Sequence, residues 1–325
     1  MSKPKLYLTR ILPEEVMDYI STKFELRFNM ENRIATREEL IEGIKWCDAL
    51  LCLLSDKIDA ELLSLNPNLK CVSNYAVGYN NIDVAAATRL GIAVCNTPGV
   101  LTESTADLAW ALMFAVARRI AEGDAFTRAG LFEGWAPKLM QGYDVFGSTL
   151  GVIGAGRIGS AVARRASGFN MRVLYFNRSK KKIDNCEATQ VGLDYLLKES
   201  DFISLNIPYT SETHHIINEK ELSLMKRNAI IINTARGACI NEVALVEALR
   251  KGLIAGAGLD VYEHEPEIMP ELLTMQNVVL LPHIGSATYK TRKVMGLLAV
   301  ENILDVLSGR IPQAIVNNEV LAKIN

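Results

Sequence analysis

The sequence lacks long apolar runs, and neither sign of charge dominates it. Its 325 residues carry a formal net charge of −2, so bulk electrostatics gives no attraction to nucleic acid or to an anionic membrane surface. Its apolar stretches are broken well below the roughly 18 residues that a membrane span needs. Residues 1–5 lead directly into a strand-like run, without the pattern of a secretory signal. We therefore expect a cytoplasmic protein with no membrane or nucleic-acid partner.

Cysteine and histidine are also scarce. The six cysteines are scattered without a C-x-x-C pair, and none of the four histidines stands at metal-ligand spacing. Cys47 and Cys52 fall in an apolar, strand-like region, and free cysteine is commonly a core residue. We therefore expect buried, reduced thiols, with neither a metal site nor a disulfide framework.

What the sequence does contain is a near-regular alternation of strand-like and helix-like segments. This alternation predicts an α/β fold with mostly parallel sheets, and the length predicts two domains. The first hundred residues look like one small doubly wound unit. Its expected strands are 6–8, 24–28, 49–54, 71–75 and 93–96, and its expected helices include 14–23 and 37–47.

A second unit is expected to open with a long apolar helix over 105–120, followed by a mixed excursion over 121–146. Six strands follow, which is the count of a complete dinucleotide-binding domain. They are expected at 149–153, 172–176, 202–206, 229–233, 256–260 and 278–281. A last helix, about 290–307 and closed by Gly309, leaves a tail too short for a domain, so it must pack on the first unit.

A glycine-rich loop predicts the cofactor site. Gly154-Ala155-Gly156-Arg157-Ile158-Gly159 follows an apolar strand and opens a helical pattern. Its three glycines permit a tight turn, close approach of a pyrophosphate, and close packing of helix on strand. The helix N-terminus then offers free N–H groups to the phosphates. Between a strand and a helix, this motif favours dinucleotide binding over an ordinary tight turn.

The next strand end indicates which nicotinamide cofactor is used. An NAD site usually has Asp or Glu at this position to hold the ribose hydroxyls. Here the residues are Asn177-Arg178-Ser179, followed by three lysines. Arg178 and Ser179 could hold a 2′-phosphate, whereas Lys181 and Lys182 are better interpreted as solvated turn residues. We therefore expect NADPH to be preferred, with NADH possible.

Three polar residues follow three successive strands of this second unit. Reduction of a 2-keto acid needs a cation for the carboxylate, a proton donor for the ketone oxygen, and a group that orients the donor. Arg236 and His283 follow buried strands at the end where parallel sheets place ligands. The orienting carboxylate could be Glu263 or Glu265, which the residues alone do not separate.

At these residues the chain resembles the D-isomer-specific 2-hydroxyacid dehydrogenases. The resemblance is carried by the loop 154–159 and by the runs 233–237, 258–266 and 282–288. Within the family the chain looks most similar to glyoxylate/hydroxypyruvate reductases, through the stretches 52–56, 101–109 and 177–179.

The resemblance implies roles for individual residues. Arg236 would bind the substrate carboxylate, His283 would deliver the proton, and Glu265, directly before the proline, would pair with His283. Substrate-loop positions are Val77 and Gly78. Further implied cofactor contacts are Thr105, Thr234, Ala235, Asp260 and Gly285. His264 departs from the family pattern, in which many relatives carry an acidic or a small residue.

The resemblance also implies the architecture: two doubly wound parallel-sheet, Rossmann-like domains, with the cofactor domain inserted into the substrate domain. Residues 1–98 with 288–325 would form a flavodoxin-like substrate domain, and 99–287 the dinucleotide-binding domain. The excursion around Trp135 resembles a dimerisation arm and implies a homodimer. Alternatives are an NAD-linked 3-phosphoglycerate or D-lactate type dehydrogenase, or a nucleotide-sensing scaffold or corepressor, although a sensor has no need for Arg236, Glu265 and His283 together.

Overall fold

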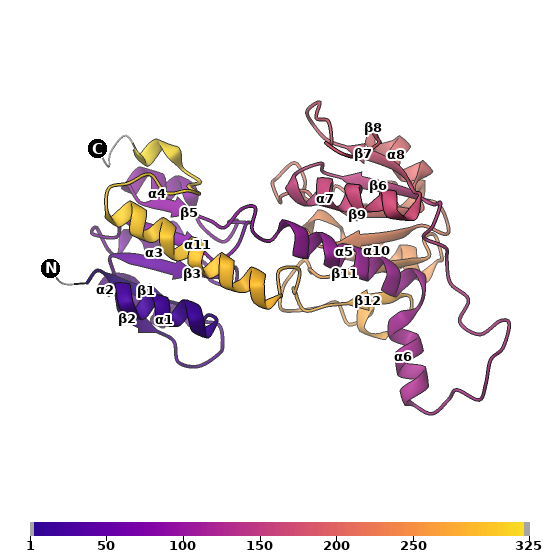
Figure 1. Cartoon of the computed structure of the whole chain (residues 1–325), viewed down its shortest axis with the longest axis horizontal. Coiled ribbons are helices and arrows are strands. Elements are labelled where there is room, and N and C mark those ends of the chain that lie inside the picture. Colours follow the sequence, from indigo (N-terminus) through magenta and orange to yellow (C-terminus); the bar gives the residue numbers. More distant parts are fainter. Residues whose placement is uncertain (1–2, 322–325) are drawn as a thin grey trace. The chain divides into compact units, whose positions relative to one another are not determined.

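The computed structural model describes residues 3–321, and the chain divides into two compact units (Figure 1). The first unit comprises the residues up to Leu101 together with those from Ala287 onward, and the second unit is Thr102–Ser286. Within residues 3–321, no helix combines the length and the apolar character needed to cross a membrane.

The first unit contains a five-stranded parallel sheet in the order β2-β1-β3-β4-β5, which is the order of flavodoxin-like folds. Strands β3 and β4 are buried along their whole length, as expected for a parallel sheet covered on both faces. Its strands are β1 (Lys5–Leu8), β2 (Glu25–Phe28), β3 (Ala49–Cys52), β4 (Cys71–Asn74) and β5 (Ala93–Cys95). Its helices include α1 (Glu14–Lys23), α2 (Arg37–Trp46), α3 (Ala60–Ser64) and α4 (Val84–Leu90).

The last long helix, α11 (Tyr289–Leu307), packs on the sheet of the first unit. The Ser73 hydroxyl on β4 donates to the carbonyl of Ala299, at 3.0 Å. Asn302 donates to the carbonyl of Asn96 and accepts from the N–H of Ala314. A left-handed residue, Gly309, follows the helix, as predicted. A segment near the end of the chain therefore completes the core begun at its start.

The second unit contains a seven-stranded parallel sheet in the order β12-β11-β10-β9-β6-β7-β8. Its strands are β6 (Thr149–Ile153), β7 (Arg172–Phe176), β8 (Ala188–Gln190), β9 (Phe202–Leu205), β10 (Ile230–Asn233), β11 (Gly256–Leu259) and β12 (Val278–Leu280). Its helices are α5 (Thr102–Ala117), α6 (Ile120–Arg128), α7 (Arg157–Arg165), α8 (Leu193–Glu199), α9 (Glu219–Leu224) and α10 (Glu242–Arg250). The prediction of six strands was wrong: β8 has three residues, none of them fully buried, and so leaves no apolar run to detect.

The predicted helix over 105–120 was wrong at both ends. Helix α5 begins at Thr102 and ends at Ala117, because Arg119 adopts a left-handed conformation with φ of 52°. A separate helix, α6, then occupies the beginning of the segment that was expected to be an irregular excursion. Helix α5 packs closely on β11, where a Cβ at Gly258 would lie 3.0 Å from the Cβ of Leu112.

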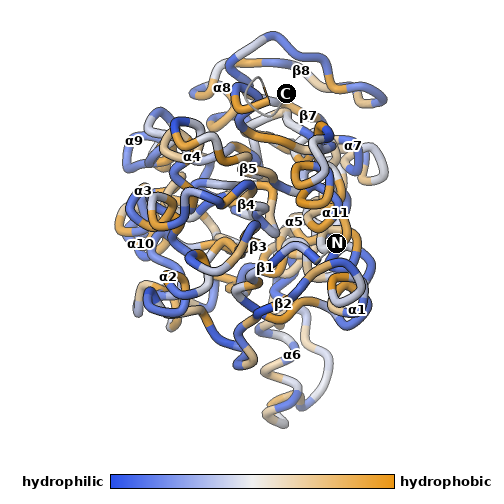
Figure 2. The backbone as a smooth tube through the Cα atoms, turned by 90° about the vertical axis from the view of Figure 1, so that its left-hand side faces the viewer, coloured by the Kyte–Doolittle hydropathy of each residue, from blue (hydrophilic) through white to orange (hydrophobic). Residues whose placement is uncertain are grey.

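Apolar residues line the strands of both sheets, while the turns between elements are mostly hydrophilic (Figure 2). Five of the six cysteines are buried in these cores, and Cys186 is half-buried. Burial raises the pKa of the Cys47 thiol to about 12, so this group stays protonated at neutral pH.

The strand order of the second unit fixes where a ligand can bind. Strands β7 and β8 lie on one side of β6, and β9 to β12 lie on the other, so the chain reverses direction across the sheet between β6 and β9. In open α/β sheets this reversal leaves a crevice beyond the carboxyl ends of the strands. The loop 154–159, Arg236 and His283 all follow strands of this sheet, at that same edge.

Candidate active site

The glycine-rich loop forms a tight turn between β6 and α7. Gly154 has φ of 93°, and a Cβ there would lie 2.7 Å from the carbonyl oxygen of Asn206. A Cβ at Gly159 would collide with the carbonyl of Gly154, so α7 packs against the turn as the motif predicts. Helix α7 has Gly156 as its N-cap, with no side chain bonded to its first N–H groups. Such a helix end can bind the phosphates of a dinucleotide.

The turn after β7 is held by hydrogen bonds of its own. The amide oxygen of Asn177 accepts from the N–H of Ala155 at 3.3 Å, and its amide nitrogen donates to Ser179. Gln190 on β8 donates to the carbonyls of both Asn177 and Ser179. This short strand, which the sequence did not reveal, therefore orients the turn that was predicted to select the cofactor.

The side chain of Arg178 extends into solvent from this turn. It is 74% exposed and forms an ion pair with Glu212 at 2.6 Å. Beside the turn lies a hollow of about 640 Å³ lined by Tyr175, Lys180, Lys181, Lys182, Gln190, Val191 and Gly192. Lys181 and Lys182 are exposed, as expected of solvated turn residues.

Two buried polar atoms at the same edge of the sheet have no hydrogen-bond partner among the described residues. They are the amide oxygen of Asn206, which follows β9, and the hydroxyl of Thr234, which follows β10. Buried polar groups are normally paired, so both atoms fit a polar ligand at this edge. Thr234 was predicted as a cofactor contact, and Asn206 was not.

Arg236 is positioned by the end of β10. Asn233 accepts from the N–H of Ala235 at 3.0 Å and donates to the carbonyl of Arg236 at 2.9 Å, which closes the turn. The guanidinium also donates to the carbonyl of Ala235. Burial lowers the pKa of Arg236, an effect that the charge of Glu265 opposes. A partly desolvated arginine binds a carboxylate more strongly than one surrounded by water.

His283 and Glu265 form a hydrogen-bonded pair. The Nδ1 atom of His283 lies 2.7 Å from one carboxylate oxygen of Glu265, and the other oxygen accepts from the N–H of Tyr262 at 3.0 Å. Burial tends to raise the pKa of Glu265, but the hydrogen bond and charge of His283 outweigh it, so the net shift is downward. Glu265 is therefore a carboxylate at neutral pH. His283 adopts φ of 55°, a left-handed conformation that is uncommon outside glycine and often marks functional sites.

The competing carboxylate lies elsewhere. Glu263 is 2.6 Å from His215, and its N–H donates to Glu242. The structure therefore places Glu265, and not Glu263, beside His283.

Asp260 organises the loop that carries His283. Its two carboxylate oxygens accept from the N–H groups of Ile284, at 2.7 Å, and Gly285, at 2.8 Å. A Cβ at Gly285 would approach both Asp260 and Thr105, so these three predicted cofactor contacts lie together. Burial raises the pKa of Asp260, partly offset by its backbone donors. The Tyr262 hydroxyl, which the sequence did not single out, donates to Leu281 at the end of β12.

In the first unit, the predicted substrate loop follows β4. Asn74 donates to the carbonyl of Gly78 at 2.7 Å, and Asn96 donates to the carbonyl of Val77 at 2.8 Å. Within residues 3–321, neither Val77 nor Gly78 has an acceptor for its own N–H group. The loop thus has fixed carbonyls and two N–H groups that could bind an anion.

The seven-stranded parallel sheet with a glycine-rich loop at its reversal point defines a Rossmann dinucleotide-binding domain. Residues 110–285 match the family model described as D-isomer specific 2-hydroxyacid dehydrogenase, NAD binding domain. The chain belongs to the D-isomer specific 2-hydroxyacid dehydrogenase family.

Relatives and solved structures match along the whole chain. A glyoxylate reductase of Thermococcus litoralis is 50% identical over 98% of both chains. The crystal structure of a glyoxylate reductase from Paecilomyes thermophila has a TM-score of 0.87 and 38% identity, covering 98% of this chain and 100% of that one. An NADPH-dependent glyoxylate/hydroxypyruvate reductase from Sinorhizobium meliloti, solved with NADP and malonate, has a TM-score of 0.85 and 32% identity over 98% of both chains.

Proposed function

We propose that this chain reduces small 2-keto acids, glyoxylate and hydroxypyruvate, to D-2-hydroxy acids by hydride transfer from NADPH. The observation that carries the proposal is the hydrogen-bonded pair of His283 and Glu265, with the charge of Arg236 acting on Glu265. Glyoxylate reductases matched along their whole length support the choice of substrate.

In this proposal, Arg236 binds the substrate carboxylate and polarises the ketone. His283 directs Nδ1 to Glu265, so Nε2 is the ring nitrogen that holds the proton and gives it to the ketone oxygen. Glu265 acts as a positioning residue, because it fixes the ring and stabilises its protonated form. When bound, the nicotinamide cofactor supplies the hydride. Val77 and Gly78 remain predicted substrate contacts in the first unit.

The preference for NADPH rests on the turn after β7. No carboxylate stands where an NAD site usually has one, and Asn177, Arg178 and Ser179 offer donors to a 2′-phosphate. The relative from Sinorhizobium meliloti is NADPH-dependent. The alternative is an NADH-linked enzyme of the 3-phosphoglycerate or D-lactate type. It is supported by the ion pair between Glu212 and Arg178, because the charge of Glu212 partly neutralises the group expected to bind the 2′-phosphate.

The test is an absorbance assay at saturating NADPH with glyoxylate, hydroxypyruvate, pyruvate and bulkier 2-keto acids. We expect turnover with glyoxylate and hydroxypyruvate, and a His283→Ala variant should lose about a hundredfold or more of it while binding NADPH normally. The matched control is His264→Ala, which removes an exposed histidine from the neighbouring turn and should keep full activity. Near-normal turnover in His283→Ala would contradict the mechanism, and tight NADPH binding without any turnover would favour a nucleotide sensor.

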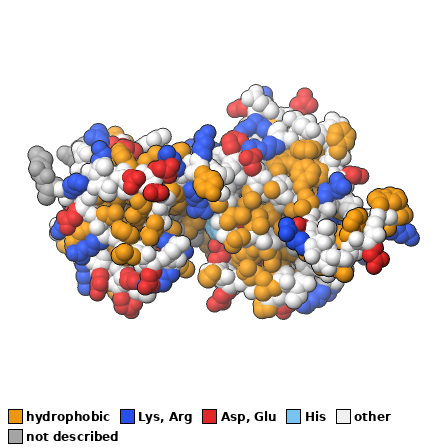
Figure 3. Space-filling view, turned by 60° about the horizontal axis from the view of Figure 1, so that its bottom comes forward, with side chains coloured by type: hydrophobic (Ala, Val, Ile, Leu, Met, Phe, Trp, Pro, Cys, Tyr) orange, Lys and Arg blue, Asp and Glu red, His pale blue; other side chains and the backbone are white. Residues whose placement is uncertain are grey.

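A homodimer also belongs to the proposal. Helix α6 and the segment that follows it expose large apolar side chains, and hydrophobic side chains are visible on the surface of the second unit (Figure 3). The implied dimerisation arm is this segment. A cytoplasmic location stays a prediction.

A further inference from the structure

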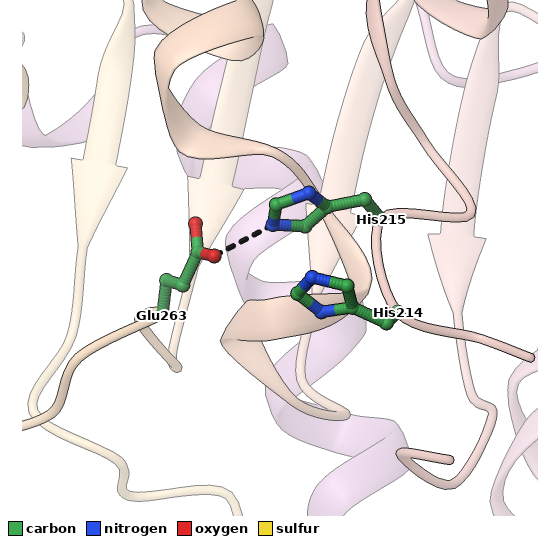
Figure 4. Close-up of side chains that lie close together, drawn as sticks. All are labelled: His214, His215 and Glu263. Atoms are coloured by element: carbon green, nitrogen blue, oxygen red, sulfur yellow. Dashed lines mark hydrogen bonds and ion pairs between the residues drawn. The ribbon is translucent and has the colours of Figure 1, made fainter. Parts of the chain in front are cut away.

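Two adjacent histidines and a glutamate come together near the turn that carries Glu265. His214 and His215 lie between β9 and α9, and Glu263 follows β11 (Figure 4). One potential ligand atom from each of the three side chains lies within 4.8 Å of the others. None of these residues has a part in the proposed reduction.

The two imidazole rings are stacked, with centroids 3.8 Å apart and an angle of 24° between their planes. A ring nitrogen binds a metal ion in the plane of its ring, so the exposed ring of His214 must rotate out of the stack to point a nitrogen at the ion. The Nε2 atom of His215 already lies 2.6 Å from Glu263, so two of the three groups are oriented before any ion binds.

The backbone on both sides of the cluster is anchored. His215 adopts a left-handed φ of 49°, and its N–H donates to the carbonyl of Ala238 at 2.9 Å. Opposite, the N–H of Glu263 donates to the carboxylate of Glu242 at 2.7 Å. The segments are therefore held in place by contacts that do not use the potential ligand atoms, which reduces the entropy that binding must overcome.

Burial is graded across the cluster. The side chains of His215 and Glu263 are only 25% and 15% exposed, whereas His214 is exposed. An ion can therefore arrive from solvent on the side of His214 and keep water ligands there. Two imidazole nitrogens and one carboxylate oxygen suit zinc and similar transition metals, and do not suit magnesium or calcium.

The distances are close to those of a metal site. Zinc binds nitrogen and oxygen ligands at about 2.0–2.2 Å, so two tetrahedral ligands lie about 3.4 Å apart. The longest of the separations, at most 4.8 Å, must shorten and the 2.6 Å between His215 and Glu263 must lengthen, which rotation of His214 and small shifts of the other two side chains provide.

We propose that His214, His215 and Glu263 form a binding site for one divalent cation of the zinc class. The ion joins the segment after β9 to the segment after β11, which are 48 residues apart in sequence at His215 and Glu263. That separation, and the adjacency of the histidines, explain why the sequence suggested no metal site. The inference stands independently of the proposed reductase activity.

The experiment measures ZnCl₂ binding to the tag-free, metal-stripped full chain by isothermal titration calorimetry, with thermal melts in parallel. We expect one equivalent of zinc with micromolar affinity, an increase in Tm at saturating zinc, and no response to MgCl₂. His214→Ala is the main variant because its side chain is exposed, so its loss should not disturb folding. We expect it to weaken zinc binding by about tenfold or more, and Glu263→Gln to do the same.

His264→Ala is the matched control, since His264 is exposed and adjoins Glu263 in sequence. It should keep the zinc affinity of the unmodified chain. The proposal is overturned if the unmodified chain binds no zinc, or if His214→Ala and His264→Ala bind it equally well. Because the readouts are heat and Tm, neither result depends on whether the chain reduces a keto acid.

Discussion

Arg178 is the residue on which cofactor selectivity depends. Both members of its ion pair with Glu212 are largely exposed, and such pairs contribute little stability, so a 2′-phosphate can compete for the guanidinium. We predict that Arg178→Asp reverses the preference between NADPH and NADH, because a carboxylate repels the phosphate and can accept from ribose hydroxyls. The ratio of kcat/KM values for the two cofactors measures the effect.

Glu212→Gln is the informative companion to that variant. It leaves Arg178 without its acidic partner, so the preference for NADPH should increase. An unchanged ratio in Arg178→Asp would show that the turn after β7 does not recognise the 2′-phosphate.

Single site residues could be predicted from the sequence where their position after an apolar strand was sufficient to place them at the ligand-binding edge of the sheet. Arg236 and His283 both follow apolar strands, and parallel strands bring their ends to one edge. Glu263 and Glu265 could not be separated in this way, because both follow β11. Their difference depends on contacts between loops of different strands: Glu263 meets His215 after β9, and Glu265 meets His283 after β12.

At the scale of elements, the junction of β6 and α7 depends on Gly159. A methyl group there would overlap the carbonyl of Gly154 and lie 3.1 Å from Val152, and backbone cannot move aside cheaply. We predict that Gly159→Ala lowers the free energy of unfolding by about 1–3 kcal/mol, measured by urea denaturation without cofactor.

Gly156→Ala is the control within the same loop. Gly156 has φ of −70°, which alanine adopts readily, and a Cβ there would meet nothing within 4 Å. The free energy of unfolding of the Gly156→Ala variant should differ from that of the unmodified chain by less than about 0.5 kcal/mol. NADPH affinity should nevertheless fall, because the added methyl group occupies the space through which the pyrophosphate approaches. Equal losses of stability in the two variants would contradict this division of roles.

Element types were predictable where an apolar pattern was strong. Strands such as β9 and β10 are buried along their whole length and mostly apolar, whereas β8 is short and half-exposed. The end of α5 was misjudged because Arg118 and Arg119 are compatible with a helix by propensity. At this helix end the carbonyl of Ala117 accepts from the N–H of Tyr143 at 2.8 Å, a contact between distant residues that no local pattern records.

At the scale of the whole molecule, the exposed apolar side chains after α6 predict self-association. Leu131 and Phe132 are each 57% exposed, and Trp135 is 85% exposed. Grouped exposed apolar side chains of this size typically mark a surface that binds another protein chain. We expect a homodimer by light scattering, and a monomer when Phe132 and Trp135 are both replaced by serine.

The control for this prediction is Leu273→Ser. Leu273 is 61% exposed, but lies in a short 3-10 turn (Leu272–Thr274) outside the segment after α6. The dimer should persist in this variant. A monomeric unmodified chain would refute the prediction.

The packing of α11 on β4 also determines the order in which the chain can finish folding. Ser73 and its partner Ala299 are 226 residues apart, and the whole second unit is synthesised between them. At about 5–20 residues per second, the ribosome needs roughly 10–45 s to cover that distance. During this interval the part of the first sheet that α11 covers, around β3 to β5, lacks its helix. The unit that is begun first is therefore finished last, and until α11 is made its partly uncovered sheet is exposed to chaperones and to aggregation.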